Sequence, residues 1–210
     1  MSEQTILQFL RNSFLHRPLR SLAHWYILQR WQLNGRPLPP PALYKQKLVQ
    51  EYGRRYALQT LVETGTAQGK MIRACQDHFQ RIISIELDPQ LHRQAQSQFA
   101  VSPHITLLQG DSGNVLAEVL AALSQPALFW LDAHAMVGGI RPPQITPILQ
   151  ELDHLLAHSI SFHVILIDDA RLFIEKSAYP SIPQVQSTIE KSNPALSVTV
   201  KDDVIRICPT

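Results

Sequence analysis

The stretch LVETGTAQGKM, residues 61–71, decides the fold of this chain. An apolar run ends at the acidic Glu63, crosses a turn bounded by Gly65 and Gly69, and enters a helical pattern. This order predicts a buried parallel strand, a tight turn and the start of a helix. Such a unit often seats a nucleotide-sized cofactor, because glycines let a ligand approach the backbone closely.

Two further apolar runs end in the same way. The run 81–86 closes on Glu86, and the run 105–109 leads into Asp111 and Ser112. The carboxyl ends of parallel strands meet at one edge of a sheet, so these acids are expected to line one cleft. A cleft of this kind suits a ligand that carries hydroxyl groups and positive charge.

Strand-like and helix-like segments alternate from residue 59 to the end of the sequence. This alternation predicts an α/β fold, in which a doubly wound, mostly parallel sheet of seven strands carries helices on both faces. Lys201-Asp202-Asp203 is typical of a hairpin turn, so the last two strands are expected to be antiparallel. The expected strands cover residues 59–63, 81–86, 104–108, 127–131, 162–167, 196–200 and 203–208, and the expected helices cover residues 68–79, 89–99, 112–123, 144–157 and 183–191.

A stiff proline-rich joint at residues 36–41 divides the sequence into two parts. Residues 1–41 are expected to form a basic helical appendage that can close over the rest as a lid. Residues 42–210 are expected to form the core domain.

The appendage is predicted to contain a helix from Thr5 to about Trp31 that is broken near Pro18. Residues 1–58 carry nine Lys and Arg side chains against two acids, whereas the remainder is acidic. This basic excess either attracts an anionic partner or belongs to a solvated helix face, and both interpretations stay open.

The composition is that of an ordinary globular protein, with 45% hydrophobic and 17% charged residues among 210. We expect a cytoplasmic protein, because the sequence has no stretch of membrane-spanning length and no secretion signal at its start. Cys75 and Cys208 lack the spacing of a disulfide framework or a metal site. Both thiols are therefore expected to be buried and reduced.

The chemistry of the first turn favours one nucleotide-type ligand over another. The turn between Gly65 and Gly69 lacks the Gly-x-Gly-x-x-Gly spacing of dinucleotide sites, and Glu63 would repel their phosphates. S-adenosylmethionine carries no phosphate. Its ammonium and sulfonium groups are favoured by an acid at a strand end.

The order of strand-end residues from Glu63 to Asp111 resembles that of class I S-adenosylmethionine-dependent methyltransferases, which have a Rossmann-like fold. The resemblance covers about residues 42–208. It implies that the Gly65 turn lies against the methionine part, that Glu86 binds the ribose hydroxyls and that Asp111 binds the adenine amino group. The implied cofactor-binding residues are Glu63, Gly65, Thr66, Gly69, Glu86, Leu87, Asp111, Ser112 and Asp132.

Each of these positions also has a purely structural interpretation. Gly65 can serve a left-handed turn, Glu86 can be a solvated strand end, and Asp111 can cap the helix that follows it. Ala67 stands where the family often has a middle glycine, which leaves less room at the turn.

The fourth and fifth expected strands also end in acids, at Asp132 and at the pair Asp168 and Asp169. This arrangement is similar to that of metal-dependent O-methyltransferases of the catechol and macrocin type, and it implies that these three residues bind Mg²⁺. His134, which that pattern does not require, is a candidate ligand, base or cap. In the alternative interpretation, the segment 168–171 is a charged turn with an internal ion pair.

We therefore expect S-adenosylmethionine-dependent O-methylation of a small molecule, assisted by Mg²⁺, with Asp132, His134 and Asp168 as catalytic residues. The alternative is a cofactor-binding or interaction protein without catalysis. A nucleic acid is a disfavoured acceptor, because the segment 131–134 differs from the Asn-Pro-Pro-Tyr type of motif. Association into a homo-oligomer stays open.

Overall fold

The computed structural model describes residues 16–132, 146–175 and 178–210. The chain divides into two compact units, Met1–Leu48 and Val49–Thr210. The division falls within helix α3, Ala42–Arg55, whereas the sequence predicts the boundary just before this helix. Each unit is described by itself.

The first unit contains helix α2, His16–Leu33, and the first turns of α3. Trp31 holds the proline-rich joint, because its indole N–H donates to the carbonyl oxygen of Pro37 at 2.9 Å. The same ring packs against Tyr44, with 4.6 Å between ring centroids. The part of the predicted helix before residue 16 lies outside the described residues, and Pro18 falls in the first turn of α2, where its missing N–H breaks no helical hydrogen bond.

In the described part of the second unit, seven strands form one sheet in the order β3-β2-β1-β4-β5-β7-β6. The first five are parallel, whereas β7 is antiparallel to both β5 and β6. This topology confirms the predicted doubly wound sheet with a C-terminal hairpin. The strands are β1 Thr60–Thr64, β2 Arg81–Glu86, β3 Ile105–Gln109, β4 Leu128–Leu131, β5 Val164–Ile167, β6 Leu196–Lys201 and β7 Val204–Pro209.

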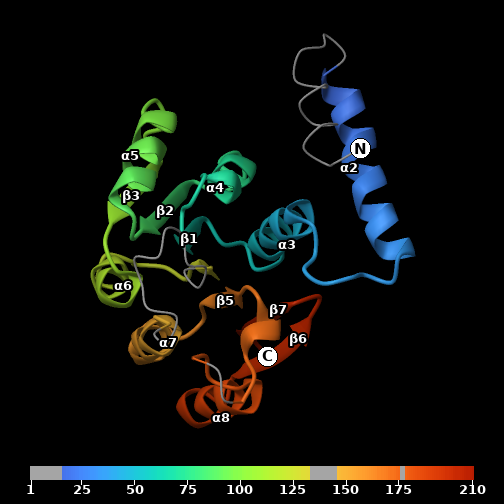
Figure 1. The fold of residues 1–210 in the computed structure, drawn as a ribbon. Helices are drawn as coiled ribbons and strands as arrows, with labels where there is room; N and C mark the ends of the chain where they lie inside the picture. Colours follow the sequence, from blue (N-terminus) through green and yellow to red (C-terminus); the bar gives the residue numbers. More distant parts are fainter. Residues whose placement is uncertain (1–15, 133–145, 176–177) are drawn as a thin grey trace. The chain divides into compact units, whose positions relative to one another are not determined.

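Helices lie on both faces of this sheet, with α4 and α5 on one face and α6, α7 and α8 on the other (Figure 1). A continuous apolar core fills the space between the sheet and the second group of helices, and it includes Phe129 and Leu116, which are fully buried. The helices are α4 Lys70–Cys75, α5 Pro89–Gln98, α6 Ser112–Ala121, α7 Ile148–Ala157 and α8 Ile182–Ser192, with a 3₁₀ turn, η1, at Ala170–Leu172.

Two predicted helices are too long. The helix expected at 68–79 is reduced to α4, because Gly69 has a left-handed backbone (φ 64°) and the amides of His78 and Phe79 turn back to the carbonyl of Cys75. The helix expected from residue 144 begins only at Ile148, after Pro147, and residues 144–145 lie outside the described residues.

The structure contains the predicted C-terminal hairpin, and both cysteines are buried. Asp202 and Asp203 both have a left-handed backbone, with φ of 50° and 66°, as a two-residue hairpin turn requires. Cys75 and Cys208 are buried free thiols, as predicted. None of the described helices combines the length and apolar character that a membrane crossing requires.

Candidate active site

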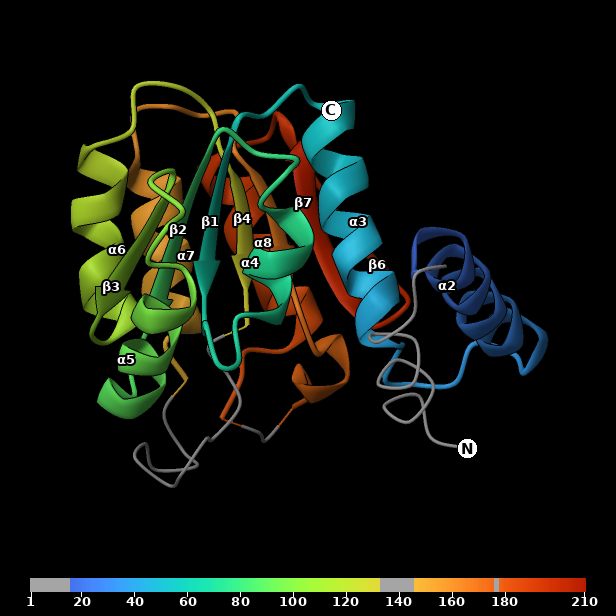
Figure 2. The same cartoon turned by 90° about the horizontal axis from the view of Figure 1, so that it is seen from above.

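The strand order reverses its direction between β1 and β4, and ligands of open α/β sheets bind at such a reversal. Pairing continues just past the strands, because the amide of Asp132 donates to the carbonyl of Thr64 and that of Asp168 to Leu131, both at 3.0 Å. Both acids therefore stand at the edge where the parallel strands end, and Figure 2 shows β1, β2 and β4 along their length.

The turn after β1 depends on left-handed backbone conformations. Gly65, Ala67 and Gly69 have φ of 90°, 46° and 64°. At Gly69 space is also limiting, because a Cβ atom would lie 2.7 Å from a ring carbon of Phe99. The structure therefore contains the left-handed turn that the sequence predicts at Gly65, and Gly69 is needed for both its backbone and its small size.

Glu63 lies beneath this turn rather than at its mouth, since β1 ends one residue later than predicted and the Glu63 side chain is 2% exposed. The Ser84 hydroxyl donates to a Glu63 carboxylate oxygen at 2.5 Å. Ser84 Oγ and Thr66 Oγ1 are 2.6 Å apart. Because the Ser84 hydroxyl already donates its hydrogen bond to Glu63, the Thr66 hydroxyl is the donor to Ser84. These side chains link the first turn to the interior of β2.

Burial raises the pKa of Glu63 to about 8. The negative charges of Asp132 and Glu86 act in the same direction, while the hydrogen bond from Ser84 acts against them. The neutral acid is therefore favoured at neutral pH. A cation placed near this site would favour the ionised form instead.

Glu86 joins the loops that follow β1 and β2. One of its carboxylate oxygens accepts the amide N–H of Ala67 at 2.7 Å, and the other accepts that of Asp88 at 2.9 Å. The side chain is 6% exposed, so the interpretation of Glu86 as a solvated strand end is wrong. A carboxylate has about four acceptor positions, so Glu86 keeps capacity for ligand hydroxyls. Leu87, which is half-buried, follows it in the same loop.

Asp111 and Ser112 begin α6 at the end of β3. Asp111 caps the helix by accepting the amide N–H of Gly113 at 3.0 Å, so its predicted structural role is present. The Ser112 hydroxyl is buried and has no hydrogen-bond partner among the described residues, and the same is true of Thr64. Buried hydroxyls normally have a partner, so these two mark places where a bound molecule could supply one.

The two acids after β5 interact with groups of the turn that follows them. Asp168 is 1% exposed and accepts the amide N–H of Asp169 at 2.8 Å. Asp169 forms an ion pair of 2.9 Å with Arg171, which also pairs with Asp203. The internal ion pair that the sequence offers as an alternative to metal binding is thus present.

The described residues contain no group of three His, Cys, Asp or Glu side chains placed to hold a metal ion. His134, a predicted catalytic residue, lies outside the part of the chain that the structure describes. His154, on α7, and His158, the residue that follows this helix, do not act together: His154 contacts the carbonyl of Gly113 at 2.9 Å, and His158 contacts His163 at 2.9 Å.

Tyr179 is a site residue that the sequence does not reveal. Burial raises the pKa of its hydroxyl, and the charges of Asp169 and Asp132 raise it further. Its ring packs against Phe173, with 5.2 Å between centroids. The residue belongs to no periodic pattern or motif, so only the fold brings it to the strand ends.

Comparison with solved structures shows the fold of class I S-adenosylmethionine-dependent methyltransferases. An O-methyltransferase from Bacillus cereus in complex with SAH superposes with a TM-score of 0.59 over 99% of this chain and 100% of that chain, at 14% identity. A Podospora anserina methyltransferase bound to SAH gives 0.57 over 88% and 87%, at 16% identity. The Streptomyces achromogenes O-methyltransferase of tomaymycin synthesis, in complex with SAM, gives 0.57 over 89% and 88%, at 14% identity. No family model matches the sequence, and no curated protein matches it.

Proposed function

We propose that this chain binds S-adenosylmethionine at the ends of β1, β2 and β3 and transfers its methyl group to an oxygen atom of a small molecule. The observation that carries this proposal is Glu86, a buried carboxylate fixed by the amides of Ala67 and Asp88 beside the Gly65 turn. Its position on β2, next to β1, is where a ribose would need an acceptor for its hydroxyls.

The residues present fit this cofactor. Gly65 provides a left-handed turn, Glu86 retains acceptor capacity, and Asp111 stands at the end of the next strand. The Ser112 hydroxyl, for which the described residues supply no hydrogen-bond partner, adds a polar group to the same edge. Solved structures with this fold and bound SAH or SAM support the assignment.

The chemistry requires alignment and removal of one proton. When bound, S-adenosylmethionine supplies an electrophilic methyl group on its sulfonium sulfur. The S–C bond breaks as the acceptor O–C bond forms, and the acceptor hydroxyl must lose its proton. We assign this proton to the carboxylate of Asp132, which is half-buried at the β1/β4 reversal, whereas Asp168 is almost completely buried. His134 stays a predicted alternative base.

The strand-end acids do not fit a resident Mg²⁺ ion in the described structure. Asp169, one of the three predicted ligands, has its carboxylate paired with Arg171, and no three-ligand group occurs among the described residues. We therefore route no step of the reaction through a metal ion.

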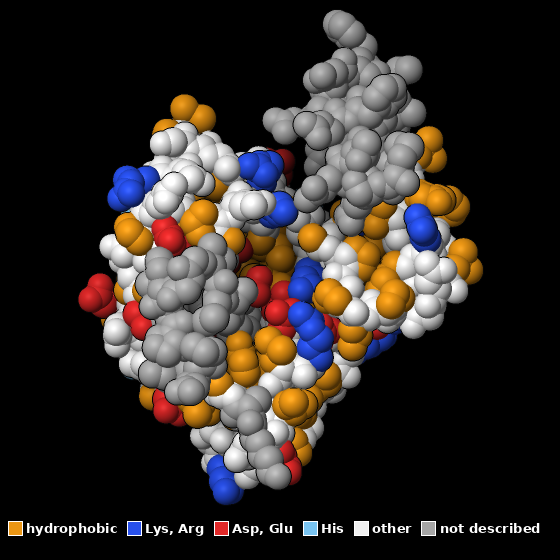
Figure 3. Space-filling view, viewed as in Figure 1, with side chains coloured by type: hydrophobic (Ala, Val, Ile, Leu, Met, Phe, Trp, Pro, Cys, Tyr) orange, Lys and Arg blue, Asp and Glu red, His pale blue; other side chains and the backbone are white. Residues whose placement is uncertain are grey.

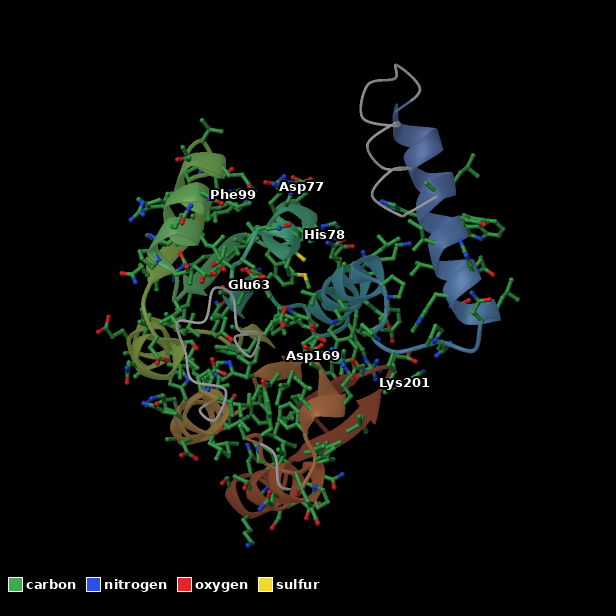
Figure 4. All side chains as sticks on the ribbon, viewed as in Figure 1. Glu63, Asp77, His78, Phe99, Asp169 and Lys201 are labelled. Atoms are coloured by element: carbon green, nitrogen blue, oxygen red, sulfur yellow. The ribbon has the colours of Figure 1, made fainter. Side chains whose placement is uncertain are left out.

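Calorimetric titration with S-adenosylhomocysteine tests the binding part of this proposal. We expect the wild type to bind, and Glu86→Gln to weaken binding by about tenfold or more, because charge-assisted hydrogen bonds to the ligand are lost. Asp77→Asn is the matched control, since Asp77 is an exposed acid outside the proposed site, labelled in Figure 4. Absence of binding by a folded wild-type protein would overturn the proposal.

A methyl-transfer assay over phenols, sugars and small acids tests the catalytic part. We expect turnover with at least one small hydroxyl compound, and a loss of turnover in Asp132→Asn that exceeds its loss of cofactor affinity. Cofactor binding without turnover on any acceptor would favour the non-catalytic alternative. Methylation of RNA or DNA alone would contradict the assignment of a small-molecule acceptor.

A further inference from the structure

Three charged side chains from two distant segments meet beside the end of β5. Arg171 Nη1 lies 2.9 Å from Asp169 Oδ1 and also pairs with a carboxylate oxygen of Asp203, in the β6–β7 hairpin. The Arg171 amide N–H donates to the other Asp203 oxygen at 2.9 Å. The guanidinium group therefore sits between two carboxylates.

The backbone fixes this arrangement from both sides. Asp169 and Asp203 both adopt left-handed conformations, with φ of 56° and 66°. The amide of Ala170 donates to the Asp203 carbonyl oxygen at 2.8 Å, which ties the 3₁₀ turn to the hairpin. The Asp203 side chain is completely buried, so this pairing belongs to the folded core rather than to a mobile surface contact.

A cation beside this edge of the sheet is favourable. Asp132, Asp168 and Asp169 follow neighbouring parallel strands, and a nearby positive charge lowers the repulsion between carboxylates that share one edge. Figure 3 shows acidic and basic side chains side by side near the middle of the viewed face, and Figure 4 labels Asp169 at the end of β5. The guanidinium of Arg171 supplies such a charge, and its planar fork suits two carboxylate partners.

We propose that Arg171 is a built-in cation that takes the place of a divalent metal ion beside Asp169 and positions the carboxylate of that residue. This inference rests on the proposed methyltransferase function, within which it makes Arg171 a positioning residue and the reaction independent of Mg²⁺. The side chain of Arg171 is 36% exposed, so its charge lies at the margin of the site and does not need to be desolvated completely.

Mn²⁺ titration of the ligand-free protein, followed by the electron paramagnetic resonance signal of the free ion, tests this assignment. We expect wild-type binding to be weaker than about 1 mM, because Asp169 already has a cation partner. Arg171→Gln should bind Mn²⁺ about tenfold or more tightly, since hard oxygen ligands then lack their counter-ion. Arg171→Gln/Asp169→Asn should lose this gain, which locates the ion at Asp169.

Two further variants separate the effect of this position from a general loss of positive charge. Arg93→Gln removes an exposed arginine of α5 and should behave as the wild type. Arg171→Lys keeps the charge and should also bind Mn²⁺ weakly. Thermal unfolding shows whether each variant is folded. If Arg171→Gln does not fold, Mn²⁺ binding by Asp169→Asn is compared with that by the wild type. We expect the two to bind Mn²⁺ equally weakly.

Two results of the Mn²⁺ titrations would overturn the proposal. One is wild-type Mn²⁺ binding in the micromolar range that Asp169→Asn abolishes, and the other is a folded Arg171→Gln variant with no gain in Mn²⁺ affinity. Methyl transfer that EDTA abolishes and Mg²⁺ restores would contradict it as well. Failure of S-adenosylhomocysteine to bind would refute the proposed function, but it would leave the Mn²⁺ measurements, made without ligand, as a separate test.

Discussion

Glu63 and Ser84 face each other across the pairing of β1 with β2, and their side chains are joined by a hydrogen bond of 2.5 Å. Thr66 extends this contact into the first turn, so a titratable group in the interior is connected to the backbone that would hold a cofactor. The protonation state of Glu63 is consequently coupled to the stability of the fold and, under the proposed function, to the charge of the ligand.

The stability of the protein should decrease as pH rises through the range in which Glu63 ionises. Burial raises the pKa of Glu63 from its ordinary value of 4.5 to about 8, so the folded state holds a proton that the unfolded state has lost. The stabilising effect of this proton is complete below about pH 4.5 and disappears above about pH 8, with a slope of at most about 1.4 kcal/mol per pH unit.

Urea unfolding at about pH 5.5 and about pH 8.5 measures this dependence. We expect Glu63→Gln to show a flatter change in the free energy of unfolding than the wild type, because the amide does not ionise. Glu118→Gln, at an exposed position of α6, should retain the wild-type slope. Equal slopes for Glu63→Gln and the wild type would rule out Glu63 as the group responsible.

The preference for S-adenosylmethionine over S-adenosylhomocysteine should increase with pH. The two ligands differ by the methyl group and the positive charge on sulfur, and the ionised form of Glu63 attracts this charge. We expect the ratio of the two dissociation constants to shift toward S-adenosylmethionine between about pH 7 and about pH 9. Calorimetric titrations measure both constants, and the α-amino group shared by the ligands cancels in their ratio.

Glu63→Gln provides the decisive comparison for this preference. The ratio of the two dissociation constants of this variant should be nearly independent of pH over the same range, because glutamine does not ionise. A wild-type ratio that does not vary with pH would show that Glu63 does not sense the sulfonium charge.

Substitution of Gly69 should destabilise the protein through two separate causes. Alanine is strained at φ 64°, and its Cβ would lie 2.7 Å from a ring carbon of Phe99. We expect Gly69→Ala to lower the free energy of unfolding by about 1–3 kcal/mol. Denaturant unfolding measures the loss, with Ala100→Gly as a control for a change at an exposed neighbouring position.

A double-mutant cycle with Phe99→Leu separates these causes. The smaller side chain removes the close contact but not the backbone strain, so Gly69→Ala should cost less in the Phe99→Leu background than in the wild type. Strict additivity of the two changes would mean that the ring of Phe99 does not limit residue 69.

Much of this fold could be predicted because each of its signals is local. Asp88 and Pro89 predict a helix start, and in the structure Asp88 accepts the amides of Gln90 and Leu91 at the beginning of α5. Likewise, an apolar run that ends in an acid and a glycine defines β1 and its turn without reference to distant residues. Local chemistry of this kind is readable from one sequence.

The contacts that the sequence does not reveal join residues far apart in the chain. Arg171 and Asp203 are 32 positions apart, and nothing in either local pattern indicates that the β6–β7 hairpin meets the turn after β5. Ser84 lies in the middle of an apolar strand, where a serine carries no functional signal until β1 places Glu63 opposite it. Strand neighbours and hairpin positions decide these contacts, and both depend on the whole topology.

His163, a buried titratable group, should destabilise the fold in acid. Its Nδ1 accepts the amide N–H of Ala127 at 3.1 Å, so the proton of the neutral ring is on Nε2, which donates to His158 Nδ1 at 2.9 Å. Burial and, to a smaller extent, the neighbouring His158 together lower the pKa of His163 to about 4. A proton added to Nδ1 would remove the acceptor of the Ala127 amide.

Because the unfolded state binds this proton more readily, stability should be complete above about pH 6.5 and should fall toward about pH 4, by at most about 1.4 kcal/mol per pH unit. Urea unfolding at about pH 7.5 and about pH 4.5 measures the loss. We expect His163→Gln, which is less stable at both pH values, to lose less between them than the wild type does, whereas His78→Gln, at an exposed turn, should keep the wild-type loss. The same acid-induced loss in His163→Gln and in the wild type would assign the effect to other groups.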